Sequence, residues 1–485
     1  MAHYAVRESP PLRGEIPIST SKNAVLPIMC GALLTGEDVR IERVPELTDV
    51  KTLCALLASC GCSVKKEGDA LVLNAGALQN PQDEEDVRKM RASVLVLGPL
   101  LSRLGEARIP LPGGCAIGQR PIDQHLKGMS ALGAKVKFDH GGVTLSGRLR
   151  GAVIYLDMPS VGATENLLMA ATLASGTTRI ENAAKEPEIV DLAAFLNRCG
   201  GCVQGAGTST IRVQGRRMLY SCSFAPMADR IVASTLACAC AAAGGRVELT
   251  GCRPETYAPL LEILAQMGCR VETGPESAVI TRLGALHGAG RVFTGVYPAL
   301  ATDAAPLLAA AMLAADSASS IEDVVFERRF GCAEGFAAFG AAVQVQGRTL
   351  DIRPVRQLQG ACARAADLRG GAALVVAALA ARGRSRITDT GYIDRGYAGF
   401  AQMLAELGAQ IEREMPRESA SEKKTPSKSK IDLHSGQKDD TIQLYKCKQI
   451  ISVRYAQFYD KIRWRTKLWH SCSMKKWTKM LRRSR

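Results

Sequence analysis

One cysteine of this 485-residue chain lies in a setting that suits chemistry. Cys115 stands in Leu111-Pro-Gly-Gly-Cys115-Ala-Ile-Gly-Gln-Arg120, where glycines on both sides predict a mobile, solvent-accessible loop. A nearby cation such as Arg120 lowers the pKa of an exposed thiol, which suits the thiol to proton donation or nucleophilic attack. The alternative that these residues leave open is an inert thiol in a glycine-rich turn.

Two other loops carry charged residues that local structure does not explain. Thr20-Ser-Lys22-Asn23 follows a strand pattern, and Ile393-Asp-Arg395-Gly-Tyr397 lies near the other end of the repetitive region. Arginine forks suit phosphate and carboxylate, so a set of cations together with Asp303 could converge on a small, highly charged anion. For each cation the alternative is an exposed charge on a helix or loop. The set comprises Lys22, Arg91, Arg120, Arg329, Arg369 and Arg395.

Several common classes of site are missing from the sequence. It contains no Walker A loop, no histidine-rich metal cluster and no dinucleotide-binding fingerprint after a first strand. Cys199-Gly-Gly-Cys202 has metal-like spacing, but no second Cys/His pair lies at zinc-finger distance. We therefore expect no metal and no cofactor.

Six copies of one unit must position these residues. Each copy runs as an apolar helix end, a turn, a short strand, an amphipathic helix, a glycine turn and another strand. The turn glycines are separated by 72, 67, 68, 72 and 68 residues; they are Gly61, Gly133, Gly200, Gly268, Gly340 and Gly408. Each unit is a small α/β module with one apolar face, which it cannot bury alone.

Three such faces can bury each other, so six units predict two lobes of three units. We expect residues 21–227 to form the first lobe, which carries the Cys115 loop. Residues 1–20 and 228–415 form the second, with the strand pattern at 4–19 crossing to it. A substrate is expected in the cleft between the lobes.

Charge is concentrated in the remaining segment, 416–485, which holds 19 Lys/Arg against 6 Asp/Glu, whereas 1–415 holds 43 against 41. A nearly neutral body argues against nucleic-acid binding by the folded domains. The Ser, Lys and Glu of 416–430 predict a flexible linker. Beyond it, aromatic and basic residues leave three alternatives: membrane-surface or nucleic-acid binding, partner binding, or no function. The tail is expected to be disordered or weakly structured.

Most of the 16 cysteines lie in apolar surroundings, where thiols act as small hydrophobic groups. No signal peptide and no apolar run of membrane-spanning length is visible. We expect reduced thiols, a cytoplasmic location and no membrane span. The oligomeric state is left open.

The residues resemble a known family, the UDP-N-acetylglucosamine 1-carboxyvinyltransferases, which are enolpyruvyl transferases that open peptidoglycan synthesis. The resemblance covers about residues 1–415 and rests on many segments in one order. They include Ser21-Lys22-Asn23, Met90-Arg91-Ala-Ser93, Pro112-Gly-Gly-Cys115, Arg120-Pro121-Ile122-Asp123, Pro159-Ser160-Val161-Gly162, Phe326-Glu-Arg-Arg329, Asp367-Leu-Arg369 and Ile393-Asp-Arg395. The family's fold, two inside-out α/β barrels of three repeats each, agrees with the six units.

The resemblance implies a reaction in which a sugar 3′-hydroxyl adds to C2 of phosphoenolpyruvate, C3 is protonated and phosphate is eliminated. It implies Cys115 as the proton donor and Asp303 as the base. Phosphoenolpyruvate would meet Lys22, Arg120 and Arg395 on its phosphate side, and Arg329 with Arg395 on its carboxylate side. The other implied substrate-binding residues are Asn23, Arg91, Pro121, Ile122, Asp123, Gln124, Ser160, Val161, Gly162, Val325, Asp367 and Arg369.

One departure from the family pattern concerns the base. Met-Gln usually follows the aspartate, whereas Ala304-Ala305 follow Asp303 here, which removes an amide near the base. Two alternatives stay open. The first is a 5-enolpyruvylshikimate-3-phosphate synthase-like transferase, although that enzyme lacks the Pro-Gly-Gly-Cys loop. The second is an inactive paralogue that acts as a binding protein through its tail.

Overall fold

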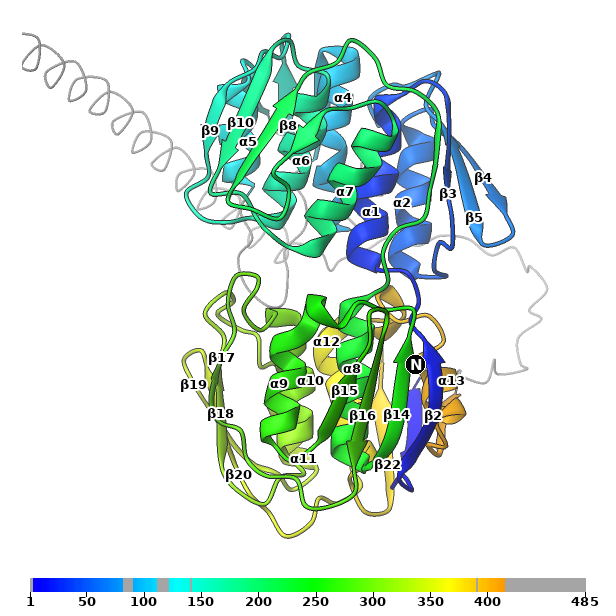
Figure 1. Ribbon diagram of the computed structural model, residues 1–485, viewed down its shortest axis with the longest axis vertical. Helices are drawn as coiled ribbons and strands as arrows, with labels where there is room; N and C mark the ends of the chain where they lie inside the picture. The colour runs from blue at the N-terminus through cyan, green and yellow to red at the C-terminus, as the bar shows by residue number, and fades with distance from the viewer. Residues whose placement is uncertain (1–2, 82–89, 111–121, 140–141, 390, 415–485) are drawn as a thin grey trace, which may run out of the picture. The chain divides into compact units, whose positions relative to one another are not determined.

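Six small sheets, each accompanied by helices, make up the described part of the chain (Figure 1). The computed structural model describes residues 3–81, 90–110, 122–139, 142–389 and 391–414. The predicted tail, 416–485, and the Cys115 loop lie outside these ranges.

The strands of each sheet are given in spatial order. Three sheets are built mainly from the first half of the chain: β13 (Cys222–Phe224), β3 (Asp38–Ile41), β5 (Ala70–Asn74) and β4 (Ser63–Glu67); β6 (Glu106–Ile109), β8 (Gly142–Ser146) and β7 (Lys135–Asp139); β11 (Val203–Gln204), β12 (Thr210–Gln214), β10 (Thr177–Glu181) and β9 (Val153–Tyr155). The other three are β15 (Arg270–Thr273), β16 (Ser277–Arg282), β14 (Gly245–Thr250) and β2 (Leu12–Pro17); β17 (Gly290–Phe293), β18 (Ser319–Glu322), β20 (Thr349–Arg353) and β19 (Ala342–Gln346); β21 (Cys362–Arg364), β22 (Arg384–Thr388), β1 (His3–Arg7) and β23 (Ile411–Glu414).

One pairing pattern recurs in these sheets. In β17-β18-β20-β19 a parallel pair is followed by two antiparallel pairs. Four other sheets repeat this pattern, and β6-β8-β7 shows its two antiparallel pairs within the described residues. The sequence repeat is therefore a structural repeat.

Two hydrophobic cores hold the sheets and helices together. One contains residues between Val25 and Leu219, and we call this part the first lobe; the other contains residues from Tyr4 to Ile18 and from Ile231 to Ile411, the second lobe. The helices of the first lobe are α1 (Lys22–Gly31), α2 (Thr48–Ser59), α4 (Leu97–Leu104), α5 (Asp123–Ala131), α6 (Val161–Thr172) and α7 (Pro187–Arg198). Those of the second are α8 (Arg230–Ala243), α9 (Ala258–Gln266), α10 (Ala305–Met312), α11 (Ala333–Ala338), α12 (Leu368–Leu379) and α13 (Phe400–Glu406). The domain boundaries set out above stay a prediction.

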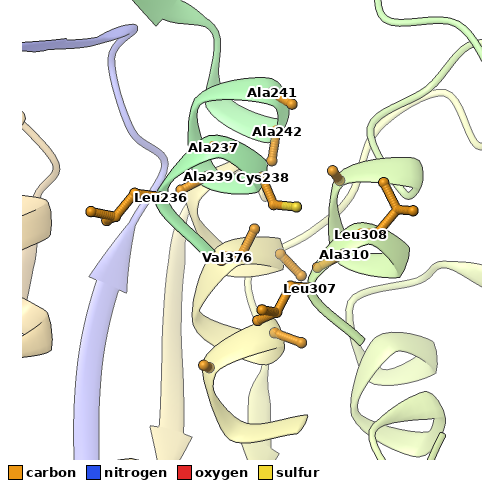
Figure 2. Close-up of a cluster of buried hydrophobic side chains, with 14 of the residues drawn as sticks. Leu236, Ala237, Cys238, Ala239, Ala241, Ala242, Leu307, Leu308, Ala310 and Val376 are labelled. Carbon is orange, nitrogen blue, oxygen red and sulfur yellow. The ribbon is translucent and has the colours of Figure 1, made fainter. Parts of the chain in front are cut away.

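Small side chains let helices occupy the centre of a lobe. In the second lobe α8, α10 and α12 pack against one another, and the sheets lie outside them (Figure 1). Figure 2 shows the contact, where alanines of α8 such as Ala239 accompany Leu307 of α10 and Val376 of α12. Because every residue of α10 is buried, the Ala-rich composition serves a helix that is apolar all round rather than on one face.

The predicted strand at 4–19 is instead two strands in two sheets. β1 pairs with β22 and β23, whereas β2 pairs with β14. The cause is Pro10-Pro11 between them, because proline has no N–H to donate and fixes its own φ. Both strands lie in sheets of the second lobe.

The chain crosses between lobes twice, and the two crossings pair with each other. Strand β2 leads into α1, and β13 leads into α8, so each crossing joins a strand of one lobe to a helix of the other. Ser21 N–H donates to the Met227 carbonyl (2.8 Å) and Asp229 N–H to the Ser19 carbonyl (2.8 Å). This backbone pairing fixes the start of α1, where Lys22 is the first helical residue.

Two other observations bear on the cysteines and on membranes. Cys199 Sγ lies 2.8 Å from Cys222 Sγ, so its nearest recorded sulfur partner comes from β13 rather than from the Gly-Gly-Cys202 motif. Within the described residues no group of three His, Cys, Asp or Glu side chains is arranged to hold a metal ion. No helix there has the length and apolar character needed to cross a membrane.

The repeat glycines permit a stability test within one lobe. Gly61 and Gly133 both have positive φ (79° and 101°), as do the other four turn glycines. A Cβ at Gly61 would lie 2.1 Å from the Ala77 carbonyl oxygen, whereas at Gly133 the nearest atom, a carbonyl oxygen, is 3.5 Å away. Gly133→Ala should lower the free energy of unfolding by about 1–2 kcal/mol, because alanine is disfavoured in a left-handed backbone conformation. Gly61→Ala should lower the free energy of unfolding by about 1–3 kcal/mol more than Gly133→Ala does, because its Cβ overpacks against the Ala77 carbonyl. Urea unfolding of both variants measures this difference; equal losses would contradict it.

Candidate functional site

The predicted site residues recur at the first turns of helices in equivalent units. Lys22 begins α1, Arg91 begins the 3-10 helix η2 (Arg91–Val96), and Ser160 caps α6. Asp303 lies in η4 (Thr302–Ala304) directly before α10, and Asp367 caps α12. Helix N-termini present unpaired N–H groups and the positive end of the helix dipole, which favours anions. The repeat therefore places polar or charged residues at the helix starts of several units.

Lys22 lies in a buried ion cluster that spans both lobes. Its Nζ is 2.6 Å from Oδ2 of Asp49, which belongs to the first turn of α2. Oδ1 of Asp49 accepts a hydrogen bond from Nε of Arg395 (2.8 Å), which lies in η5 (Ile393–Arg395) of the second lobe. The backbone N–H of Lys22 donates to Oδ2 of Asp229 (3.1 Å). Two of the predicted phosphate-binding cations thus meet on one carboxylate.

Burial and charge act in opposite directions on this cluster. Burial lowers the pKa of Lys22, and the nearby Asp49 carboxylate opposes that change. For Asp49, burial raises the pKa, but the charge of Lys22 and the hydrogen bonds from Arg395 and Lys22 outweigh it, so the pKa lies below its usual value. The carboxylate is therefore ionised at neutral pH.

A second cluster surrounds Asp303. Its Oδ1 accepts from Nη2 of Arg329 (2.6 Å), and its Oδ2 accepts from Nε of Arg369 (3.2 Å). Arg329 is further held by Thr302 Oγ1 (3.0 Å) and lies 3.7 Å from Asp323. Both arginine side chains are buried, so the carboxylate of Asp303 is the solvent-facing end of this network.

Electrostatics links the two clusters. The Arg369 guanidinium lowers the pKa of Lys22. The pKa of Arg369 itself rises despite burial, because Tyr397, Asp303 and Asp229 all raise it. Asp229 also bonds the Lys22 backbone. Ion pairs at Asp49 and at Asp303 are therefore linked through the charge of Arg369 and through Asp229, which acts on both Lys22 and Arg369.

Residues predicted to bind the nucleotide sugar form a third neighbourhood, in the first lobe. Burial, assisted by the Arg91 guanidinium, lowers the pKa of His125 to about 3. The neutral His125 ring lies 3.1 Å from the Asn166 amide and beside Gly162, where a Cβ would sit 3.4 Å from it. Gln124 Oε1 accepts from the N–H groups of Asp157 (3.0 Å) and Met158 (3.5 Å). Gln124 therefore holds the loop before Ser160.

Other predicted residues have structural partners here. Asp367 Oδ1 accepts from the N–H groups of Arg369 and Gly370, as a helix cap does. Val325 N–H donates to Asp323 (2.8 Å) in the loop before Arg329. Asn23, Asp123 and Val161 are partly buried, and Ile122 is buried. Cys115, Arg120 and Pro121 lie outside the described residues.

Asp49, Asp229 and Asp323 were not among the predicted site residues. Each resembles a common local feature: Asp49 an acidic first-turn residue, Asp229 an N-cap and Asp323 a turn residue. The repeat could have pointed to Asp229, because Asp229 caps α8 as Asp367 caps α12. For Asp49 and Asp323, a helix-start or turn position alone does not distinguish a site residue.

A buried ion pair also joins the lobes beside this site. Nε and Nη2 of Arg230, on α8, donate to Oε1 (2.9 Å) and Oε2 (3.3 Å) of Glu188, on α7. Two further carboxyls are close: burial raises the pKa of both Glu165 and Glu186, and Glu188 adds to each rise. Arg230 is therefore the counter-charge of Glu188 and lowers the pKa of Glu186 in a cluster of buried carboxyls.

Comparison with known proteins places the chain in a family. The model of the EPSP synthase (3-phosphoshikimate 1-carboxyvinyltransferase) family matches residues 6–404. The chain belongs to the EPSP synthase family. Within it, the chain is 44% identical over 416 residues to UDP-N-acetylglucosamine 1-carboxyvinyltransferase 2 of Carboxydothermus hydrogenoformans, which covers 85% of this chain and 99% of the relative. The predicted kinship to enolpyruvyl transferases is confirmed.

Solved structures support the fold of this family member. The enolpyruvyl transferase NikO from Streptomyces tendae superposes with a TM-score of 0.75 at 24% identity, covering 85% of this chain and 98% of NikO. EPSP synthase from Acinetobacter baumannii gives 0.67 at 17% identity, covering 86% and 100%. The predicted fold class, two inside-out α/β barrels of three units each, is confirmed.

We expect the Arg230–Glu188 pair to be coupled. Arg230→Met should destabilise the protein by about 3–5 kcal/mol, because it leaves Glu188 buried without a counter-charge. Adding Glu188→Gln to that variant should recover part of the loss. Urea unfolding of the two single variants and the double variant gives the interaction energy. Additive losses would show that the pair does not contribute as a unit.

Proposed function

We propose that this member of the EPSP synthase family transfers the enolpyruvyl group of phosphoenolpyruvate to the 3′-hydroxyl of UDP-N-acetylglucosamine and releases phosphate. The observation that carries the proposal is the 44% identity to a UDP-N-acetylglucosamine 1-carboxyvinyltransferase over 99% of that relative. In the cell this would be the first committed step of peptidoglycan synthesis, in the cytoplasm.

The ion cluster at the lobe crossing supports binding of phosphoenolpyruvate. Lys22 and Arg395 come from different lobes and share Asp49, and Arg120 would join them from the loop after Cys115. Phosphoenolpyruvate carries a phosphate and a carboxylate, so convergent cations stabilise both the substrate and the charge that develops on it. Lys22 and Arg395 are its phosphate ligands in this proposal.

Asp303 is the base that takes the proton of the sugar hydroxyl as its oxygen attacks C2. Arg329 and Arg369 fix both carboxylate oxygens, and the carboxylate reaches solvent while both arginines do not. Such an arrangement presents a positioned acceptor to a substrate. Arg329 holds Asp303 here, so its implied role on the substrate carboxylate would use its remaining nitrogen, Nη1, or require release of Asp303.

Cys115 is the acid that protonates C3 and gives a tetrahedral intermediate. Cleavage of the bond from C2 to the phosphate oxygen, with loss of a proton from C3, then regenerates the double bond in the product. The support for Cys115 is its sequence setting, Pro112-Gly-Gly-Cys115 with Arg120 close behind. Asn23 would contact the intermediate.

The third neighbourhood is the proposed nucleotide-sugar site. Arg91 supplies a cation for the diphosphate, and Ser160 to Gly162 form the N-terminus of α6, where N–H groups suit the same anion. The implied sugar and nucleotide contacts of Pro121 to Gln124, Val325, Asp367 and Arg369 belong to the same proposal. No resident metal or cofactor is part of it.

Phosphate release from the two substrates tests the reaction. Wild type should turn over, Cys115→Ala and Asp303→Asn should each lose about 10²–10⁴-fold in kcat, and Cys362→Ala, which removes an exposed thiol elsewhere, should not change it. Truncation to residues 1–415 should keep activity. A wild type that is silent with UDP-N-acetylglucosamine but active with shikimate 3-phosphate would favour the EPSP synthase reaction. Silence with both would favour a binding protein.

We also expect an epoxide such as fosfomycin to inactivate the enzyme. Attack of the Cys115 thiolate on the epoxide opens the ring and forms a stable carbon–sulfur bond, since a lowered thiol pKa favours the nucleophile. Intact-mass analysis should find one adduct, and peptide mapping should place it on Cys115 rather than on exposed Cys362. An adduct on another cysteine, or none, would contradict the assignment of Cys115.

A further inference from the structure

Asp49 is a buried member of the site to which the proposed chemistry gives no role. It lies in the first turn of α2, is 4% exposed, and contacts Lys22 of the first lobe and Arg395 of the second. We propose that Asp49 is a positioning residue: its carboxylate holds the Lys22 ammonium charged and fixes its separation from the Arg395 guanidinium for a phosphate monoester. This inference rests on the proposed function and deepens it.

The contact geometry leaves both cations able to bind a substrate. Asp49 uses one oxygen for each, Oδ2 for Lys22 Nζ (2.6 Å) and Oδ1 for Arg395 Nε (2.8 Å). An ammonium has three donors and a guanidinium five, so Lys22 keeps two N–H groups and Arg395 keeps Nη1 and Nη2. Because the two oxygens belong to one rigid carboxylate, they set the spacing of the cations before a phosphate arrives.

The charges around Lys22 make a counter-ion necessary. Lys22 faces Asp49 from α2, Arg395 from η5, Arg369 from α12 and, through its backbone, Asp229 at the start of α8. Burial and the two guanidinium groups all lower the pKa of Lys22, whereas Asp49 raises it. Without the Asp49 charge, Lys22 would tend to lose its proton and could no longer attract a phosphate.

An ordinary helix-start carboxylate would act differently. An acidic residue in a first turn interacts with the helix dipole while exposed to solvent. Its removal has a small effect on stability and no effect on a distant lysine. Asp49 is instead buried and bridges two lobes. The experiment must therefore read out the charge of Lys22 and the binding of phosphoenolpyruvate, not stability alone.

The direct test is competitive acetylation of Lys22 against exposed Lys127 over a pH series, quantified by peptide mass spectrometry. The unprotonated amine reacts, so in Asp49→Asn the labelling of Lys22 should begin at least about one pH unit lower than in wild type, a tenfold change in the proton equilibrium. Asp69→Asn, an exposed carboxylate of the same lobe, should leave the profile unchanged. An unchanged Lys22 profile in Asp49→Asn would overturn the proposal.

Kinetics of the same variants give a second readout. In Asp49→Asn the KM for phosphoenolpyruvate should rise about tenfold at pH 8 and less at pH 6, where Lys22 is protonated again. The KM for UDP-N-acetylglucosamine should stay the same. Asp49→Glu keeps the negative charge and should restore the wild-type pH dependence of the KM for phosphoenolpyruvate. Equal increases in both KM values at every pH would indicate a structural role and overturn the inference.

Two provisions keep the test decisive. If Asp49→Asn fails to fold, Arg395→Gln serves in its place: it removes a repelling guanidinium that is partly exposed, so labelling of Lys22 should move to higher pH, and an unchanged profile would overturn the proposal. The labelling experiment needs no turnover. A wild type without activity would therefore refute the proposed function, whereas labelling would still decide the role of Asp49.

Discussion

Each α/β unit contains an apolar helix that it cannot bury by itself, and this constraint organises the protein. In the second lobe α8, α10 and α12 solve it by packing on one another behind three sheets. Small side chains help three almost completely buried helices to approach closely, which accounts for the alanine-rich segments. Once the helices pack around one centre, their N-termini lie in equivalent places. The packing itself then brings polar residues at those N-termini close together.

The chain crosses between the lobes twice, and these crossings bring helix starts of both lobes together. Strand β2 leads into α1 and strand β13 into α8, and the two crossings hydrogen-bond to each other at Ser21 and Asp229. Lys22 is thus fixed by backbone pairing on one side and by Asp49 on the other. Rigid placement of a buried cation needs both, because its long side chain loses conformational freedom that its contacts must offset.

Local rules explain what could be predicted from the sequence. The repeat glycines were found because a positive φ after a helix restricts the residue type at each copy. Pro10-Pro11 also acts locally, and it divides the predicted strand at 4–19 into β1 and β2. Asp49 could not be predicted, because its partner Arg395 is 346 residues away and its position alone suggests an ordinary helix start. Ala304 and Ala305, which follow Asp303, are buried members of the second core, so their small size serves packing.

The two carboxylates of the site show how one arrangement can give opposite chemistry. Asp49 and Asp303 each lie between two cations, but their exposure is reversed. At Asp49 the carboxylate side chain is 6% exposed and Arg395 is 37% exposed, so the cluster presents positive charge. At Asp303 the arginines are 1% and 3% exposed and the carboxylate 28%, so the cluster presents a carboxylate, as the proposed base requires. Two buried arginines orient Asp303 on both oxygens, and a neighbouring amide is therefore not needed to hold it. Which member of an ion cluster reaches solvent therefore decides which charge the cluster presents.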